Sequence, residues 1–212
     1  MKQDERLLEK IADDIHSQGW CVIREALPSK LAISLSVRAK QLNESEYIKA
    51  GVGRGHNHLY DNNVRQDEIY WIDESLESED NTVVDLWLSW LNNLRQYLNQ
   101  NLFLGLFSVE SHFAHYPPDG YYQKHCDAFR GQSNRKLSLV TYLNDNWNVR
   151  DGGELKLYQD LELSDGTEVI KKVLPELGTL VIFLSERFPH EVLPALRNRY
   201  SIASWFRVNT SI

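Results

Sequence analysis

Residues Phe107–Ala114 (FSVESHFA) mark the clearest change of pattern in the chain. Phe, Val, Ser and Phe at 107, 109, 111 and 113 alternate with the side chains between them, a period typical of a β-strand. Turn-forming Gly, Pro and Asp separate the strand candidates that follow. Those candidates are Tyr121–Asp127, Lys136–Asn144, Glu154–Gln159, Glu168–Leu174, Gly178–Leu184 and Tyr200–Asn209. So many short strands without intervening helices predict a sandwich or jelly-roll barrel.

The part of the chain before this stretch has mainly helical spacing. Apolar residues recur at helical intervals between Leu7 and Ile15, after Pro28-Ser29, and most strongly after Asn81-Thr82. Short strands are expected at Trp20–Ile23 and Ile69–Ile72. The fold prediction is therefore α+β: a jelly-roll core with helices, mostly N-terminal, packed on one face. Residues 1–102 form a helical support region and residues 103–212 the core, together one domain.

Composition narrows the function classes. The 212 residues are 42% hydrophobic and 25% charged, as in an ordinary globular domain, and the net charge of −7 argues against a general nucleic-acid binder. The longest apolar run, Leu180–Leu184, is far too short to cross a membrane, and no signal peptide is visible. With Cys21 and Cys126 as the only cysteines, we expect a reduced cytoplasmic protein.

Two distant segments carry the residues suited to metal chemistry. His125 and Asp127 lie two positions apart at the end of a predicted strand, so both side chains face the same side and can converge on one ion. His190 follows the apolar strand near residue 180, and Arg199 begins the last strand. Two His and one carboxylate leave adjacent positions open on a non-haem Fe(II) ion. The planar guanidinium of Arg199 suits a carboxylate ligand.

Each of these residues also has a structural interpretation. The two histidines taken singly are more often satisfied structural residues than ligands, and Arg199 could belong to a structural ion pair. His56 and His58 could form a second metal site, although such a pair in a Gly-rich loop is usually solvated. His112 and His115 are expected to be packing or surface residues.

The chain resembles the Fe(II)/2-oxoglutarate prolyl hydroxylases, and within them the hypoxia-inducible-factor prolyl hydroxylases and their bacterial relatives. The resemblance spans roughly residues 50–208, and the order and spacing of its motifs make it specific. The matching segments are Arg65–Ile72, Tyr116-Pro117, Tyr122–Asp127, Tyr142–Trp147, Gly152–Leu155, Phe188–Pro194 and Arg199–Trp205.

This resemblance implies a double-stranded β-helix that binds Fe(II) through His125, Asp127 and His190. It also implies that Arg199 and Tyr142 hold the distal carboxylate of 2-oxoglutarate. Tyr116 and Trp205 are further implied cofactor-site residues, Trp205 as a wall of the iron site. The subgroup often has Thr four residues after the arginine, where this chain has Ala203, which puts a hydrogen bond from that position in doubt.

The resemblance also implies a substrate region. A lid of about residues 50–75 would cover the entrance and meet the peptide, with Tyr122, Arg65, Asp67 and Arg135 as substrate-binding residues. We hypothesise that Asp67 pairs with Arg135 to close this lid. The alternative is that both are solvated surface charges.

The predicted function is hydroxylation of a prolyl residue in a protein or peptide, consuming 2-oxoglutarate and O2 and releasing succinate and CO2. Ascorbate is a candidate reductant, and neither nucleic acid nor membrane is an expected partner. Two alternatives stay open: an oxygenase acting on a small molecule or a non-prolyl residue, and a catalytically silent metal-binding module. Fold analogy does not decide the substrate.

Overall fold

The computed structural model describes residues 2–42, 46–51, 61, 63–72, 82–128 and 134–209. Its helices are α1 (Lys2–Gln18), α2 (Ser29–Gln41), α3 (Thr82–Leu102) and the 3-10 helix η2 (Val149–Asp151). Its strands are β1 (Trp20–Ile23), β2 (Ile48–Lys49), β3 (Glu68–Ile72), β4 (Ser108–Tyr116), β5 (Tyr122–His125), β6 (Arg135–Tyr142), β7 (Leu155–Tyr158), β8 (Val169–Val173), β9 (Leu180–Leu184), β10 (His190–Val192) and β11 (Arg199–Arg207).

The strands form two antiparallel sheets. The larger sheet has the order β1-β9-β6-β11-β4-β3-β2, and the smaller has the order β5-β10-β7-β8. Strands β1, β2 and β3 precede residue 102 in the chain, and the other strands of the larger sheet follow it. The larger sheet therefore contains strands from both the N-terminal and the C-terminal part of the chain. The predicted α+β jelly roll is confirmed.

Strand β9 shows why the larger sheet holds its place. All five residues of Leu180–Leu184 are apolar because both faces of this strand are covered. Leu180 and Ile182 belong to the core shared with the helices, whereas Val181 and Phe183 belong to a second core between the sheets. The alternation along one strand therefore contributes to two hydrophobic layers at once.

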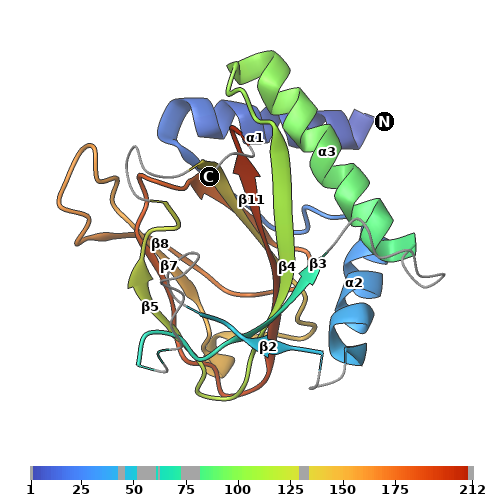
Figure 1. Ribbon diagram of the computed structural model, residues 1–212, viewed down its shortest axis with the longest axis vertical. Helices are drawn as coiled ribbons and strands as arrows, with labels where there is room; N and C mark the ends of the chain where they lie inside the picture. The colour runs from blue at the N-terminus through green and yellow to red at the C-terminus, as the bar shows by residue number, and fades with distance from the viewer. Residues whose placement is uncertain are drawn as a thin grey trace.

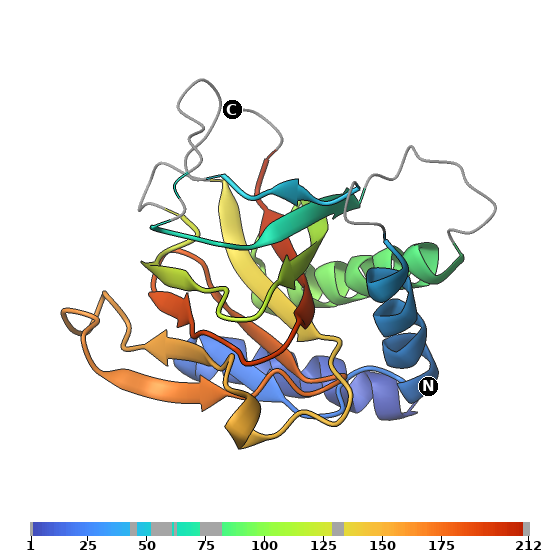
Figure 2. The same cartoon turned by 90° about the horizontal axis from the view of Figure 1, so that it is seen from below.

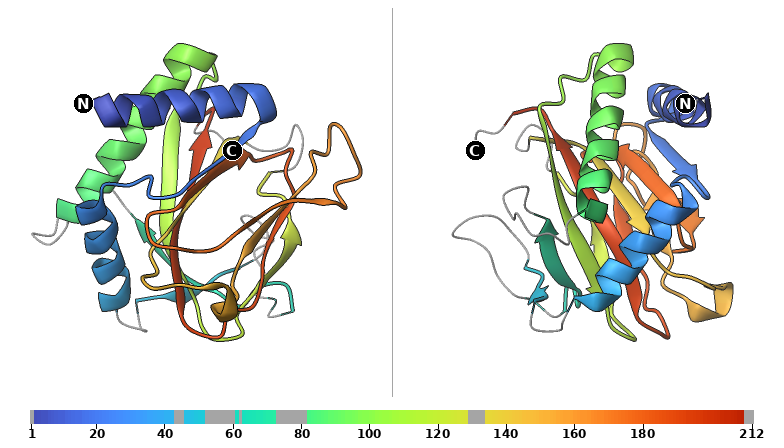
Figure 3. Two further views of the ribbon diagram at one scale, coloured as in Figure 1. Left: turned by 180° about the vertical axis from the view of Figure 1, so that it is seen from behind. Right: turned by 90° about the vertical axis from the view of Figure 1, so that its right-hand side faces the viewer.

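The helices cover the outer face of the larger sheet, as predicted. Helix α1 packs against β1, β9 and α3, and α2 packs against β11 and α3. Figure 1 shows the lower end of α3 next to α2, and the left panel of Figure 3 shows α1 crossing α3. In Figure 2 the orange β8 of the smaller sheet lies on the opposite side of the molecule from α2 and α3. Among the described helices, none has the length and apolar content that crossing a membrane requires.

Two strands were not predicted from the sequence. Strand β2 has only two residues, and β10 has three, of which two are His190 and Glu191. Neither is long enough to show a period, and each exists because a neighbouring strand pairs with it. The predicted strand 121–127 is also shorter than expected, because β5 ends at His125 and Asp127 lies in a bend.

Candidate functional site

Strand pairing brings the two distant histidines together. His190 in β10 lies directly opposite His125 in β5 in the antiparallel register of the smaller sheet. Their ring centroids are 4.3 Å apart, and Phe183 of the larger sheet packs against the His190 ring at 4.7 Å. The imidazoles therefore lie between the two sheets.

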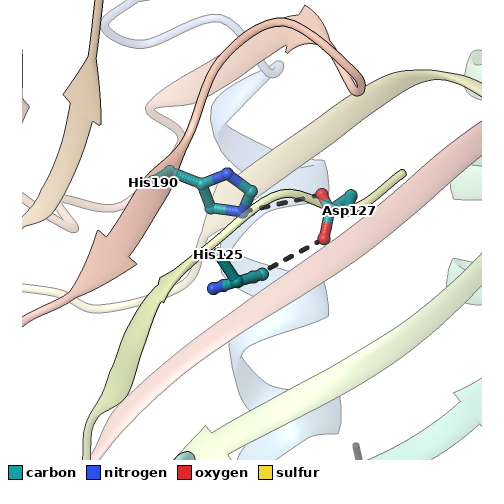
Figure 4. Close-up of side chains that lie close together, drawn as sticks. All are labelled: His125, Asp127 and His190. Carbon is teal, nitrogen blue, oxygen red and sulfur yellow. Dashed lines mark ion pairs between the residues drawn. The ribbon is translucent and has the colours of Figure 1, made fainter. Parts of the chain in front are cut away.

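The bend after β5 turns the carboxylate of Asp127 toward both rings. Its Oδ1 atom lies 3.6 Å from His125 Nε2, and its Oδ2 atom lies 3.6 Å from His190 Nε2. Figure 4 shows the three side chains pointing toward one another. One potential ligand atom from each lies within 4.8 Å of the other two, which is the spacing that a single metal ion requires. The predicted convergence of these residues is confirmed, although a bend rather than strand alternation produces it.

Backbone carbonyls fix how each imidazole faces this point. His125 Nδ1 lies 2.7 Å from the carbonyl oxygen of Gln123, and His190 Nδ1 lies 3.2 Å from that of Phe188. A carbonyl oxygen only accepts, so each Nδ1 carries the proton and donates it. The lone pair of each Nε2 is therefore free for a metal ion, as in most histidine metal sites.

Burial and the neighbouring charges favour the protonation states in which His190 and Asp127 can bind a metal ion. Burial, and to a smaller extent His125, lower the pKa of His190 to about 4, although Asp127 opposes the change. Burial alone would raise the pKa of Asp127, but His190, His125 and Arg135 hold it well below its ordinary value. At neutral pH the site therefore offers a neutral imidazole at His190 and an ionised carboxylate, the forms that bind metal.

Arg199 lies at the start of β11, with only 1% of its surface exposed. Its Nε donates to the carbonyl of Gly153 at 2.9 Å, and its guanidinium lies 4.9 Å from the Tyr116 ring centre and 5.1 Å from that of Tyr142. Among the described residues no carboxylate forms an ion pair with it. A buried cation without an anionic partner is costly, so the surroundings of Arg199 suit an acid supplied from outside.

Tyr142 strengthens this fit. Its hydroxyl is buried without a hydrogen-bond partner among the described residues, and burial raises its pKa to about 12 although Arg199 opposes the change. The hydroxyl is therefore protonated and has a proton to donate. Tyr142 and Tyr116 belong to the same inner core as Phe183, which packs on His190. The triad and Arg199 thus adjoin the same apolar core.

We call the predicted substrate-binding residues Tyr122, Arg65, Asp67 and Arg135 the rim of the site. The ion pairs among them differ from our hypothesis. Asp67 pairs with Arg65, at 2.7 Å from Oδ1 to Nε and 2.6 Å from Oδ2 to Nη2, and not with Arg135. Asp67 is buried, so the alternative of a solvated charge is also wrong for it. The Arg65 guanidinium lies 4.2 Å above the Tyr122 ring, which stacks at 3.5 Å on His125. Successive contacts therefore lead from Asp67 through Arg65 and Tyr122 to His125, a candidate metal ligand.

Arg135 belongs to a second cluster. It lies 2.7 Å from Glu110, which also accepts from Arg207 at 3.1 Å, and its guanidinium lies 3.8 Å from the Trp205 ring centre. The predicted pair of Asp67 and Arg135 does not form, because Asp67 pairs with Arg65 and Arg135 pairs with Glu110. About half of the predicted lid, including His56 and His58, lies outside the described residues.

His112 is a packing residue, as predicted. It lies between Trp71 and Trp205, at ring distances of 5.0 Å and 5.1 Å. Burial, then the cations Arg65 and Arg135, lower its pKa to about 3, so the imidazole stays neutral. His115 stacks on a tyrosine and contacts Glu68.

Two features of the site were not assigned from the sequence. Ser138 donates a hydrogen bond of 2.6 Å to Asp127, and only its inward position on the strand of Tyr142 hinted at it. Gly153 has a φ of +71°, and a side-chain carbon there would lie 3.2 Å from Cδ of Arg199. A glycine is therefore needed where the backbone holds the arginine.

Comparison with known proteins fits this geometry. Residues 111–207 match the family model of the 2OG-Fe(II) oxygenase superfamily. The crystal structure of a Pseudomonas putida prolyl-4-hydroxylase is 38% identical, covers 95% of this chain and 99% of its own, and superposes with a TM-score of 0.80. The chain belongs to the 2OG-Fe(II) oxygenase superfamily.

Other relatives of this oxygenase are also prolyl hydroxylases. A Trichoplax adhaerens prolyl hydroxylase, solved with a hypoxia-inducible factor oxygen degradation domain peptide fragment, is 27% identical over 97% of this chain and 91% of its own, with a TM-score of 0.83. The hypoxia-inducible factor prolyl hydroxylase of Caenorhabditis elegans is 26% identical over 94% of this chain. This oxygenase spans only 28% of the length of that relative.

Proposed function

We propose that this oxygenase hydroxylates a prolyl residue of a protein, with conversion of 2-oxoglutarate and O2 to succinate and CO2. His125, Asp127 and His190 would hold Fe(II). The observation that carries the proposal is the convergence of these three groups in one interior with a buried Arg199 that has no acidic partner among the described residues. A structural metal site would not need that arginine.

The protein's residues bind and orient the reactants. Arg199 would hold the distal carboxylate of 2-oxoglutarate through charge-assisted hydrogen bonds, and the Tyr142 hydroxyl would donate to the same carboxylate. Tyr116, which is protonated because burial raises its pKa well above the ordinary value, would lie beside the co-substrate, and Trp205 would wall the site. When bound, Fe(II) supplies the O2 chemistry that couples decarboxylation to hydroxylation. The apolar core around the site excludes water from these groups.

The nature of the substrate is supported by the relatives, which are named as prolyl hydroxylases, one of them with a bound peptide. We place the peptide at the rim, where Tyr122, Arg135 and the Arg65–Asp67 pair lie. A cytoplasmic location belongs to the same proposal and is supported by the two free thiols of Cys21 and Cys126. Ascorbate as reductant is tested by adding it to the assay below.

The test is succinate release from 2-oxoglutarate with Fe(II), with and without proline-containing peptides. Succinate that depends on peptide, together with a gain of one oxygen atom on proline by mass spectrometry, is expected. His125→Ala should abolish both signals. His16→Ala, on the exposed side of α1, is the matched control and should leave them intact. Turnover only with small molecules would contradict the proposed substrate, and iron binding without any turnover would contradict the enzyme.

A further inference from the structure

A pair of buried serines lies behind the candidate metal carboxylate. Ser138 Oγ in β6 is 2.6 Å from Asp127 Oδ2 and 2.8 Å from Oγ of Ser185, which follows β9. The serines are exposed by 1% and 0%, so water does not compete for these bonds. The three residues come from different parts of the chain and meet only because β6 pairs with β9 beside the end of β5.

The direction of these hydrogen bonds follows from counting protons. An ionised carboxylate only accepts, so the single hydroxyl proton of Ser138 goes to Asp127. The Ser138 oxygen must then accept from Ser185, whose proton completes a one-way chain from Ser185 through Ser138 to Asp127. The 2.6 Å distance from Ser138 Oγ to Asp127 Oδ2 is in the range for a hydroxyl that donates to an ionised carboxylate.

We propose that Ser138 and Ser185 are positioning residues that fix the rotation of the Asp127 carboxylate and so set the affinity of the site for its metal. The bond from Ser138 engages Oδ2, while Oδ1, which lies 3.6 Å from His125 Nε2, remains available to a metal ion. A carboxylate that binds through one oxygen keeps the other positions of the ion open for the co-substrate. This inference rests on the proposed function, because it requires that the triad binds metal.

The chain provides a matched control. Ser111 in β4 and Ser204 in β11 form another buried serine pair, with their Oγ atoms 2.6 Å apart. Their neighbours on the same strand faces, Phe113 and Ile202, belong to the core under the helices, so this pair lies on the opposite side of the larger sheet from the triad. Removing a hydroxyl here changes a buried hydrogen bond without touching a metal ligand.

The experiment is titration of the 212-residue protein with Mn(II), with free Mn(II) followed by electron paramagnetic resonance. Ser138→Ala should weaken Mn(II) binding by roughly 10- to 100-fold, the usual effect of losing a partner behind a metal ligand. Ser185→Ala should weaken it less, because Ser138 can still donate to Asp127. Ser138→Thr, which keeps a hydroxyl, should bind close to the wild-type level, and Ser204→Ala should bind as the wild type does.

Urea unfolding without metal separates positioning from folding. If Ser138→Ala and Ser204→Ala lose similar stability but only the first loses Mn(II) affinity, the positioning role is supported. Unchanged Mn(II) affinity in Ser138→Ala, or equal weakening in Ser204→Ala, overturns the inference while the proposed function stands. Failure of the wild-type protein to bind Mn(II) overturns both.

Discussion

Arg199 is a buried guanidinium group and Arg65 a half-buried one, and their partners differ. Arg65, at the rim, has its own carboxylate in Asp67, whose side chain is fully buried. Arg199, in the interior, has a backbone carbonyl and two aromatic rings around it, and no acidic partner among the described residues. Because an uncompensated buried charge is costly, it is retained only where something else compensates it. The comparison supports the proposal that Arg199 binds a ligand, and it predicts that Arg65 maintains the structure.

The largest expected effect is on stability at the rim. Arg65→Leu leaves Asp67 buried and unpaired, which should lower the free energy of unfolding by about 3–5 kcal/mol. Urea denaturation measures this. Arg24→Leu is the matched control, since Arg24 is 74% exposed at its contact with Glu176 and such pairs contribute at most about 1 kcal/mol. Equal losses in the two variants would remove the structural role of Arg65.

The second prediction is that a substitution at Arg199 affects ligand binding more than stability. Arg199→Leu should weaken 2-oxoglutarate binding by about 2–5 kcal/mol, or about 30- to 5000-fold, because a buried charge-assisted contact is lost. Isothermal titration of the Mn(II)-loaded protein measures it. In the absence of ligand the same variant should lose less stability than Arg65→Leu. Wild-type affinity in Arg199→Leu would break the comparison.

The third prediction concerns the hydroxyl of Tyr142, which has no hydrogen-bond partner in the described part of the chain. Tyr142→Phe should weaken 2-oxoglutarate binding by about 1.5–3 kcal/mol, the value of a hydrogen bond to a charged group, and should not destabilise the ligand-free protein. Tyr47→Phe is the opposite case, because the Tyr47 hydroxyl donates to the Ala39 carbonyl at 3.0 Å. It should lower stability by about 1 kcal/mol and leave 2-oxoglutarate binding unchanged. The same result for both variants would mean that Tyr142 does not face the co-substrate.

The smallest effect is a pH dependence at His112, which lies near the rim cations. Burial and the arginines lower its pKa from 6.5 to about 3, so between these values the unfolded chain binds a proton that the folded chain does not. Acidification therefore favours unfolding, by about 1.4 kcal/mol per pH unit below 6.5. Urea denaturation at several pH values between 7 and 5 gives the free energy of unfolding as a function of pH. This free energy should fall less steeply on acidification for His112→Leu than for the wild type. An identical slope would show that His112 is not held neutral by its surroundings.

The sequence was informative about features that depend only on residue type or on the local spacing of apolar residues. Strand alternation gave the jelly roll, and helical spacing placed the helices of the N-terminal half. The residue types at 125, 127, 190 and 199, with their order, were sufficient to propose the metal and acid chemistry. These inferences do not depend on knowing which segments are neighbours.

Only the tertiary structure decided the partners. Strand β10 has no pattern of its own, and pairing with β5 and β7 both makes it a strand and places His190 opposite His125. Asp67 meets Arg65 and Arg135 meets Glu110, because an ion pair depends on distance in space, which residue spacing along the chain does not determine. For the same reason the serine pair behind Asp127 was visible only once β6, β9 and the bend after β5 lay side by side.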